Sequence, residues 1–336
     1  MSARQGMRPP PHAAILGIGA YRPPRILSNE ALGLISPSDA VEDAELGALA
    51  ASGIRNRRRA SPAESLPVMA GSAAAKALAA AGLRASQVDH VIVSTMSRLH
   101  GAPPVSAELV QRLSMPHASF RDINAVTAGF TTALDAARST VLRMQARCVL
   151  VVGVERMFDI VDGPLTNAAL FGDGAGAVVV GPSQHPGIAP AGECAEQSHA
   201  PVVHGESWMG LRQHACYSSP YLRTDGPEMM RWALAQLPAL AMDALDRAEI
   251  RVSELDAFIP HQANAELVGK LARALHLQRG TAVALDLCEM GNTSAASIPM
   301  AAEQLLSSGR VPSGGTALLL GFGAGVAHAA QVVRLP

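Results

Sequence analysis

Three polar residues have types and positions that suit chemistry: Thr127, His261 and Asn292. Thr127 stands in DINAVTAGF, where an extended stretch gives way to an alanine-rich segment, so we expect it at the beginning of a helix. Free N–H groups and the positive dipole end favour a developing anion there, which makes its hydroxyl a candidate nucleophile. His261 in PHQAN can serve as a general base or hydrogen-bond donor, and Asn292 in GNTSAAS as a second donor to an oxyanion.

Each of these residues also has an ordinary structural interpretation. Threonine is a frequent N-cap residue, histidine is often a hydrogen-bonded interior side chain, and asparagine is common at caps and turns. The residue types therefore leave both interpretations open. The choice depends on whether the fold brings the three side chains together.

The hydrophobic pattern predicts the elements that position these residues. Residues 122–143 begin extended, break at small residues and continue with apolar side chains at helical spacing, namely Phe130, Leu134, Ala137 and Val141. Residues 257–260 predict a short buried strand that ends at His261. Residues 291–299, around Asn292, predict the opening of another helix.

The chain repeats this arrangement. An alanine-rich helix, the sequence SQVD and a strand recur as a helix, SELD and a strand, so that Asp89 and Asp256 are 167 residues apart. The same offset relates Thr127 to Ser294, each of which opens a helix of small residues. Chance similarity between alanine-rich helices is the alternative, but several elements that keep register favour a duplicated βαβ-rich unit.

We therefore predict two packed halves of an α/β protein. A flexible tail, an N-terminal half with Thr127 and a C-terminal half with His261 and Asn292 are expected at 1–13, 14–182 and 183–336. A two-fold repeat brings the beginnings of the paired helices close together at the centre of the molecule. The three candidate residues would then share one site.

The composition excludes several classes of function. The chain has 336 residues, 49% hydrophobic and 16% charged, which describes a globular protein too long for one small core. A net charge of −1 provides no field for nucleic acid or an anionic membrane, and 3% aromatic residues are too few for base-stacking platforms. No apolar run approaches the roughly 20 residues of a membrane span.

The cysteines indicate a reducing environment. Cys148, Cys194, Cys216 and Cys288 are far apart and form no CxxC or Cys/His pattern, so we expect neither a zinc site nor a disulfide framework, and a cytoplasmic location. Cys288 stands four residues before Asn292 and is a candidate substitute thiol, although we favour a buried structural cysteine.

The motifs DINAVTAGF, LFGDGAGA, PHQAN, GNTSAASIP and GFGAG occur in an order and spacing that resemble the β-ketoacyl-acyl-carrier-protein synthase III family of the thiolase superfamily. The resemblance runs from Ile15 to Arg334. It implies a thiolase-like duplicated αβαβα five-layered fold and a homodimer. It also implies a buried site at the end of a phosphopantetheine tunnel, with a carrier-protein or coenzyme A thioester as substrate and no bound cofactor.

The resemblance also assigns roles to residues. In the family a cysteine at the position of Thr127 takes an acyl group from a thioester, and the residues that match His261 and Asn292 promote decarboxylative condensation with malonyl-carrier protein. The family's oxyanion hole uses backbone amides that match Thr127 and Ala324, beside Gly323. This implies an acyltransferase of polyketide, fatty-acid-type or other specialised biosynthesis.

Threonine at the nucleophile position is the main departure from the family. A thiol of pKa about 8.5 is readily poised as thiolate, whereas an alcohol needs a base in contact. Three interpretations follow. Thr127 accepts the acyl group with help from His261, or the acyl group passes directly between substrates, or the protein is an inert partner subunit of a ketosynthase complex.

Other positions bear on the substrate. Where the family has an aromatic residue that stacks on adenine this chain has Gly47, and residues 163–165 lack the family's basic residue, so a carrier-protein donor is favoured over coenzyme A. Ala102 stands where a bulky residue often narrows the acyl pocket, which predicts room for a larger acyl group.

Basic residues are candidates for binding the phosphate of phosphopantetheine or docking an acidic carrier protein. A solvated loop is the alternative, and Glu266, where relatives tend to be basic, weakens the docking interpretation. The candidates are Arg55, Arg57 and Arg58 in a basic run that ends at Arg59, together with Lys270 and Arg273 after His261.

Overall fold

The computed structural model describes residues 11–32, 49–98, 102–161, 169–195, 203–204, 223–224, 226–323 and 327–336. Within these residues the longer strands form two five-stranded sheets. The first sheet has the order β1-β7-β6-β4-β5. Its strands are β1 (His12–Tyr21), β4 (His90–Ser94), β5 (Ser119–Ile123), β6 (Val149–Arg156) and β7 (Asp173–Ser183). β1 begins at His12, inside the predicted N-terminal tail and one residue before its predicted end.

The second sheet has the order β12-β11-β13-β14-β8. Its strands are β8 (Gly192–Ala195), β11 (Ala257–Pro260), β12 (Ala282–Val283), β13 (Thr316–Phe322) and β14 (Ala327–Arg334). β11 runs parallel to both β12 and β13, while β14 is antiparallel to β13 and to β8. In the first sheet β4 is likewise parallel to β5 and β6, and β7 is antiparallel to β6 and β1. The two sheets therefore share one topology.

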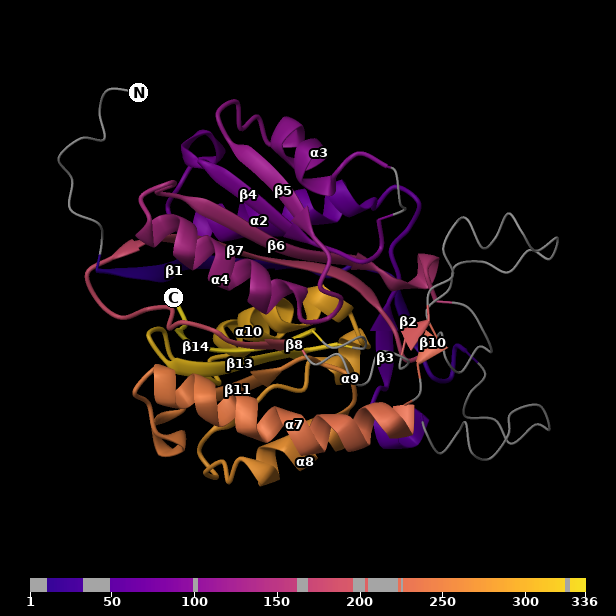
Figure 1. Ribbon diagram of the computed structural model, residues 1–336. Coiled ribbons are helices and arrows are strands. Elements are labelled where there is room, and N and C mark those ends of the chain that lie inside the picture. Colours follow the sequence, from indigo (N-terminus) through magenta and orange to yellow (C-terminus); the bar gives the residue numbers. More distant parts are fainter. Residues whose placement is uncertain are drawn as a thin grey trace.

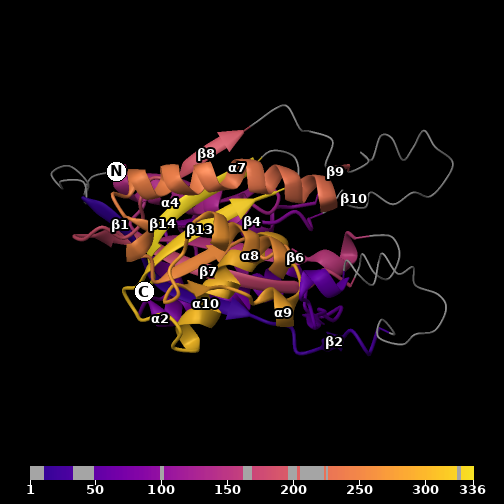
Figure 2. The same cartoon turned by 90° about the horizontal axis from the view of Figure 1, so that it is seen from below.

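Helices complete five layers, which Figures 1 and 2 show from two directions. α4 (Gly129–Leu142) and α10 (Ser297–Ser307) lie between the sheets. α2 (Leu66–Ala80) and α3 (Val105–Arg112) cover the outer face of the first sheet. α7 (Gly226–Arg247) and α8 (Ala265–Ala274) cover the outer face of the second. The predicted αβαβα fold is thus confirmed.

Short elements lie around this framework. β2 (Ile26–Ser28) pairs with β3 (Asn56–Arg58), and β9 (Val203–His204) pairs with β10 (Arg223–Thr224). α9 (Leu287–Met290) precedes Asn292, and the 3₁₀ turn η5 (Ser294–Ala296) precedes α10. The 3₁₀ turns η1 (Ala85–Gln87), η2 (Met157–Asp159) and η4 (Val252–Glu254) complete the described elements.

Asp89 and Asp256 show why the repeat is structural. Each follows a 3₁₀ turn, η1 or η4, and each precedes the strand next to one edge of its sheet, β4 or β11. The carboxylate Oδ2 of Asp89 accepts the N–H of Cys148 at 3.0 Å, and that of Asp256 accepts the N–H of Thr316 at 2.8 Å. Each aspartate therefore fixes the start of the neighbouring parallel strand. The offset of 167 residues seen in the sequence places the same hydrogen bond in both sheets.

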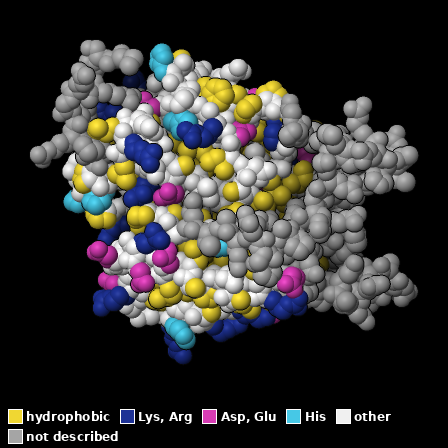
Figure 3. Space-filling model, viewed as in Figure 1, with side chains coloured by type: hydrophobic (Ala, Val, Ile, Leu, Met, Phe, Trp, Pro, Cys, Tyr) yellow, Lys and Arg dark blue, Asp and Glu magenta, His cyan; other side chains and the backbone are white. Residues whose placement is uncertain are grey.

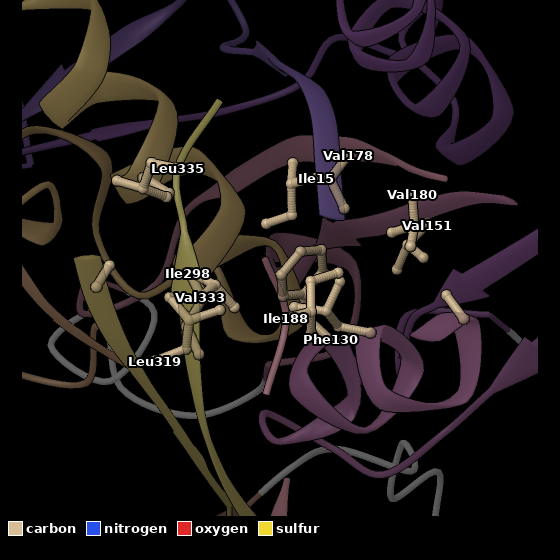
Figure 4. Close-up of a cluster of buried hydrophobic side chains, with 14 of the residues drawn as sticks. Ile15, Phe130, Val151, Val178, Val180, Ile188, Ile298, Leu319, Val333 and Leu335 are labelled. Atoms are coloured by element: carbon tan, nitrogen blue, oxygen red, sulfur yellow. The ribbon is translucent and has the colours of Figure 1, made fainter. Parts of the chain in front are cut away.

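The main core lies between the sheets, around α4 and α10. Figure 4 shows Phe130 of α4 near Ile188, and Ile298 of α10 near Val333 and Leu319. All four apolar positions predicted for the 122–143 segment are buried. Burial of this stripe, and not helix propensity alone, holds α4 in the central layer. No helix of the described residues has both the length and the apolarity needed to cross a membrane.

Candidate active site

Thr127 lies in the turn between β5 and α4. The preceding residue, Val126, has a positive φ of 51°, an uncommon conformation for a β-branched residue. α4 begins at Gly129, and Ala128 is its N-cap residue, without a side-chain cap. Thr127 is therefore not the N-cap of α4. Its hydroxyl instead donates a hydrogen bond to the backbone carbonyl of Phe322, at the end of β13 in the second sheet.

Gly323 explains how the two halves approach so closely at this point. A Cβ on Gly323 would lie 2.5 Å from Oγ1 of Thr127 and 3.1 Å from its backbone nitrogen. The N–H of Gly323 donates to the carbonyl of Ala327 at 3.0 Å. This N–H is therefore engaged and does not fit the predicted oxyanion role. Ala324, the other predicted oxyanion residue, lies outside the described residues.

His261 follows β11 and is almost completely buried. Its backbone N–H donates to the carbonyl of Leu320 at 2.8 Å, which ties it to β13. Its Nδ1 lies 2.8 Å from the hydroxyl of Ser297, at the start of α10. The edge of the ring packs against Phe322, with centroids 5.2 Å apart and planes at 76°. These contacts fix the orientation of the imidazole.

Burial controls the charge of His261. Desolvation lowers the pKa of the imidazole to about 3, and a hydrogen bond with the backbone of Ser294 only partly opposes this. The ring is therefore neutral at neutral pH. A neutral, oriented imidazole is suited to hydrogen bonding with a substrate, whereas so low a pKa makes it a weak base for an alcohol.

Asn292 is held by backbone and side chain together. Its N–H donates to the carbonyl of Leu170 at 2.8 Å, and its carbonyl accepts from Gly172 at 3.0 Å. Its side-chain Oδ1 accepts the N–H of Ser294 at 2.9 Å. The amide oxygen is thus occupied, and the amide NH₂ has no hydrogen-bond partner among the described residues. The residue is half-buried, and the hydrogen bond at Oδ1 fixes the direction of its NH₂ group.

The structure therefore brings the three predicted residues to one place. Phe322 connects Thr127 with His261, through its carbonyl and its ring respectively. Ser294 connects His261 with Asn292. The sequence analysis missed the roles of Phe322 and Ser297, because a backbone acceptor has no residue signature and Ser297 is one of several serines in GNTSAAS. Ser297 stands three residues after Ser294, about one helical turn, and this spacing is the one sequence feature that could have indicated its role.

The predicted docking residues are not all at the surface. Arg55 is exposed and pairs with Glu289 at 2.6 Å, and Arg273 is exposed on α8. Arg58 is partly buried and donates to the carbonyl of Pro23 at 3.1 Å. Lys270 pairs with Glu266 at 2.7 Å.

Arg57 departs from the docking prediction. Its side chain is fully buried, and it donates to the carbonyls of Ala169 at 2.7 Å and Leu27 at 3.2 Å. Burial lowers the pKa of its guanidinium to about 10. The alternation of a β-strand turns this arginine inward between Asn56 and Arg58, so it joins β2 to the backbone of Ala169 and does not point outward.

The remaining predictions have mixed outcomes. Cys288 is half-buried and not fully buried as expected; it packs beside Ile54 and Val268, and burial raises the pKa of its thiol, which disfavours a thiolate. Ala102 is exposed. The predicted departures at Gly47 and at 163–165 lie outside the described residues.

The duplicated sheets and the buried polar cluster define a thiolase-fold protein of the condensing-enzyme class. The chain belongs to the β-ketoacyl-acyl-carrier-protein synthase III family. Residues 245–335 match the model for the C-terminal part of 3-oxoacyl-[acyl-carrier-protein (ACP)] synthase III, and residues 121–193 match the model for 3-oxoacyl-[acyl-carrier-protein (ACP)] synthase III itself.

Individual relatives agree over almost the whole chain. The β-ketoacyl-[acyl-carrier-protein] synthase III of Streptomyces glaucescens is 40% identical over 97% of this chain and 97% of its own length. The solved structure of the priming β-ketosynthase from the R1128 polyketide biosynthetic pathway has a TM-score of 0.91 and 39% identity, over 98% of this chain and 99% of that one. The solved structure of the 3-oxoacyl-[acyl-carrier-protein] synthase III of Aquifex aeolicus VF5 has a TM-score of 0.85 and 30% identity, over 96% of this chain and 99% of that one.

Proposed function

We propose that this protein is a ketosynthase III-like acyltransferase that moves an acyl group from a carrier-protein thioester to an acceptor, in polyketide or fatty-acid-type biosynthesis. The observation that carries the proposal is the retained pair of His261 and Asn292, both oriented by hydrogen bonds beside Thr127. A structural relic needs neither polar group, because burying polar side chains costs free energy unless they are satisfied.

His261 and Asn292 act on the acceptor in this proposal. The neutral imidazole and the amide NH₂ hold the carbonyl oxygen of an acceptor such as a malonyl thioester. Loss of carbon dioxide from that thioester leaves an enolate, whose oxygen the two groups stabilise. The enolate carbon then attacks the acyl carbonyl, a carbon–carbon bond forms, and the donor thiolate leaves.

We further propose that Thr127 does not carry the acyl group. Its hydroxyl proton is directed at a carbonyl oxygen, which cannot act as a base, and the neighbouring imidazole is a weak one. Of the three interpretations from the sequence, this supports direct transfer from the donor thioester to the acceptor. Thr127 then serves to hold the Phe322–Gly323 turn against the first half, while both substrates occupy the site together.

Basic residues at the surface support a proposal about the partner protein. We propose that an acidic carrier protein docks on Arg55, Arg58, Lys270 and Arg273, near the loop and helix that carry the site. Figure 3 shows Lys and Arg side chains along the lower margin of the molecule, on the side of α7 and α8. Packing of Ile54 against Val268 places the Arg55 loop beside α8.

A homodimer is proposed on the edge of the first sheet. β5 is the terminal strand of that sheet among the described residues, and its Phe120 is 47% exposed. An exposed strand edge with a large apolar side chain is a template for pairing with a second copy. Ala102 would lie in the acyl pocket near this interface.

Transfer assays test the proposed function. Purified protein is mixed with a panel of acyl-carrier-protein donors and malonyl-carrier protein, and products are followed by mass spectrometry. Wild type is expected to form product, and His261→Ala and Asn292→Ala to lose it. If wild type forms no product alone but does so in complex with a relative that has an intact cysteine motif, the partner-subunit interpretation replaces this proposal.

A further inference from the structure

Glu155 is a buried carboxylate near the end of β6. It accepts hydrogen bonds from the loop that follows β4: from the hydroxyl of Thr95 at 3.2 Å, the N–H of Met96 at 3.1 Å and the N–H of Ser97 at 3.1 Å. The hydroxyl of Ser97 also donates to it. Among the described residues it has no basic partner. The side chain is therefore held within the first half by uncharged donors.

The same carboxylate reaches the second half. Ser294 and Ala295 lie close enough to the carboxylate to lower its pKa, and the hydroxyl of Ser294 donates to Sδ of Met96 at 3.1 Å, the residue whose N–H donates to Glu155. Two residues earlier on β6, a Cβ on Gly153 would lie 2.3 Å from the carbonyl oxygen of Ala295. β6 is thus pressed directly against the turn of residues 292–296, and only glycine allows that approach.

The turn of residues 292–296 orients the side chains of Asn292 and His261. The N–H of Ser294 donates to Oδ1 of Asn292, and the backbone of Ser294 is hydrogen-bonded to the ring of His261. Ser294 has a positive φ of 46°, a conformation that neighbouring contacts must hold for a residue other than glycine. Any shift of Ser294 would move the amide of Asn292 and the partner of His261 together.

We propose that Glu155 is a positioning residue that fixes the Ser294–Ala295 turn from the opposite half, and thereby sets the orientation of the Asn292 amide and the His261 imidazole. Its catalytic consequence rests on the proposed function, because only a transferase would show it in turnover. Its structural consequence, a fixed His261 ring, does not depend on turnover.

The chemistry of the neighbours explains why a carboxyl group stands here. Four donors from Thr95, Met96 and Ser97 converge on the two oxygens, and Ser294 and Ala295 lie beside them. A carboxylate offers about four lone-pair positions, whereas an amide offers one oxygen and two unwanted donors. Burial raises the pKa of Glu155 to about 7. No basic side chain among the described residues opposes this rise, so the negative charge is stabilised by these hydrogen-bond donors alone.

The test combines kinetics with a spectroscopic signal from His261. The variants are Glu155→Gln and Glu155→Ala, with Glu64→Gln as the matched control. Glu64 likewise accepts a hydroxyl from Tyr21 and an N–H from Ser61. Among the described residues it has no hydrogen bond to Thr127, His261 or Asn292. Histidine-selective ¹⁵N labelling reports the ring of His261, assigned by its loss in His261→Asn, and thermal unfolding reports the fold.

The expected result is a changed His261 ring signal in both Glu155 variants and an unchanged signal in Glu64→Gln. We expect kcat to fall about 10-fold in Glu155→Gln and about 100-fold in Glu155→Ala, with KM for carrier protein within about twofold, since small misplacements of reacting groups cost rates of this order. If Glu155→Ala fails to fold, Glu155→Gln alone decides.

An unmoved His261 signal in folded Glu155→Gln, or a KM change without a kcat change, would overturn the proposal. A moved signal without transfer activity in wild type would leave Glu155 as a positioning residue and remove the proposed function instead. The two failures are thereby separated.

Discussion

The hydroxyl of Thr127 donates its hydrogen bond to the carbonyl oxygen of Phe322, and no hydrogen bond joins it to His261 among the described residues. Thr127 therefore joins the turn before α4 to the end of β13, and so links the two halves of the protein. His261 and Asn292 are oriented by other contacts, through the hydroxyl of Ser297 and the N–H of Ser294 respectively.

The close approach of Gly323 to Thr127 gives a first prediction. In Gly323→Ala the new Cβ would collide with Oγ1 of Thr127 at 2.5 Å, so we expect a loss of about 1–3 kcal/mol in the free energy of unfolding. Gly280→Ala is the control, because no atom of the described part of the chain lies within 4 Å of its Cβ position. Urea unfolding measures both.

A double-mutant comparison tests the contact between Gly323 and Thr127 directly. In a Thr127→Ala background the main collision is gone, so the cost of Gly323→Ala should shrink, giving an interaction free energy between the two sites. An equal loss of unfolding free energy in both backgrounds would show that Thr127 and Gly323 are not in contact.

Local patterns allowed much of the fold to be predicted. The helical spacing of Phe130 and Leu134 placed α4, and the recurring SQVD and SELD motifs around Asp89 and Asp256 indicated the duplication, which the same hydrogen bond in each sheet bears out. The motifs then placed Thr127, His261 and Asn292 together. These features depend on residue types over short stretches, which a sequence displays directly.

Long-range features were not predictable in the same way. The partner of the Thr127 hydroxyl is a backbone carbonyl 195 residues away, and Glu155 acts across the two halves. The burial of Arg57 depends on which face of β3 packs inward, which a basic run does not reveal. Such contacts arise from packing between elements and carry no residue pattern.

The low pKa of His261 predicts acid sensitivity. Above about pH 6.5 the ring is neutral in the folded and unfolded states and adds no pH dependence. As pH falls, the unfolded ring takes up a proton at its ordinary pKa, whereas the folded ring does not until about pH 3. The free energy of unfolding should therefore fall between these values, by up to about 1.4 kcal/mol per pH unit.

Urea midpoints at pH 7.5 and 5 test this for wild type and His261→Asn. We expect a smaller pH dependence in the variant, and an unaltered one in His276→Asn, since His276 is exposed. The same pH dependence in His261→Asn as in wild type would contradict a neutral buried imidazole.

Asn292 and Asn264 allow a comparison of two asparagines. Asn292→Ala removes the free NH₂ and the acceptor for Ser294, so we expect kcat to fall about 10²- to 10³-fold, as for loss of an oxyanion donor. Asn264 is the N-cap of α8 and accepts from Leu267 at 2.7 Å. Asn264→Ala should instead cost about 1 kcal/mol of stability with kcat retained. Similar kcat losses in both would argue against a donor role for Asn292.

Docking on α8 predicts a charge effect. Arg273→Glu should weaken binding of an acidic carrier protein by up to about 5-fold at low salt, and the difference should diminish as salt increases. Arg247→Glu, an exposed change on α7, is the control. Fluorescence anisotropy with labelled carrier protein measures both. Equal effects of the two changes would place the docking surface elsewhere.

Intact-protein mass spectrometry tests the central claim most directly. Wild type, Thr127→Ala and Thr127→Cys are each incubated with acyl-carrier-protein donors that support transfer. We predict no added acyl mass on wild type, product formation by both wild type and Thr127→Ala, and an acyl adduct only on Thr127→Cys, whose thiol is the better nucleophile. An adduct on wild type that maps to Thr127, with transfer lost in Thr127→Ala, would contradict direct transfer and show that the threonine carries the acyl group.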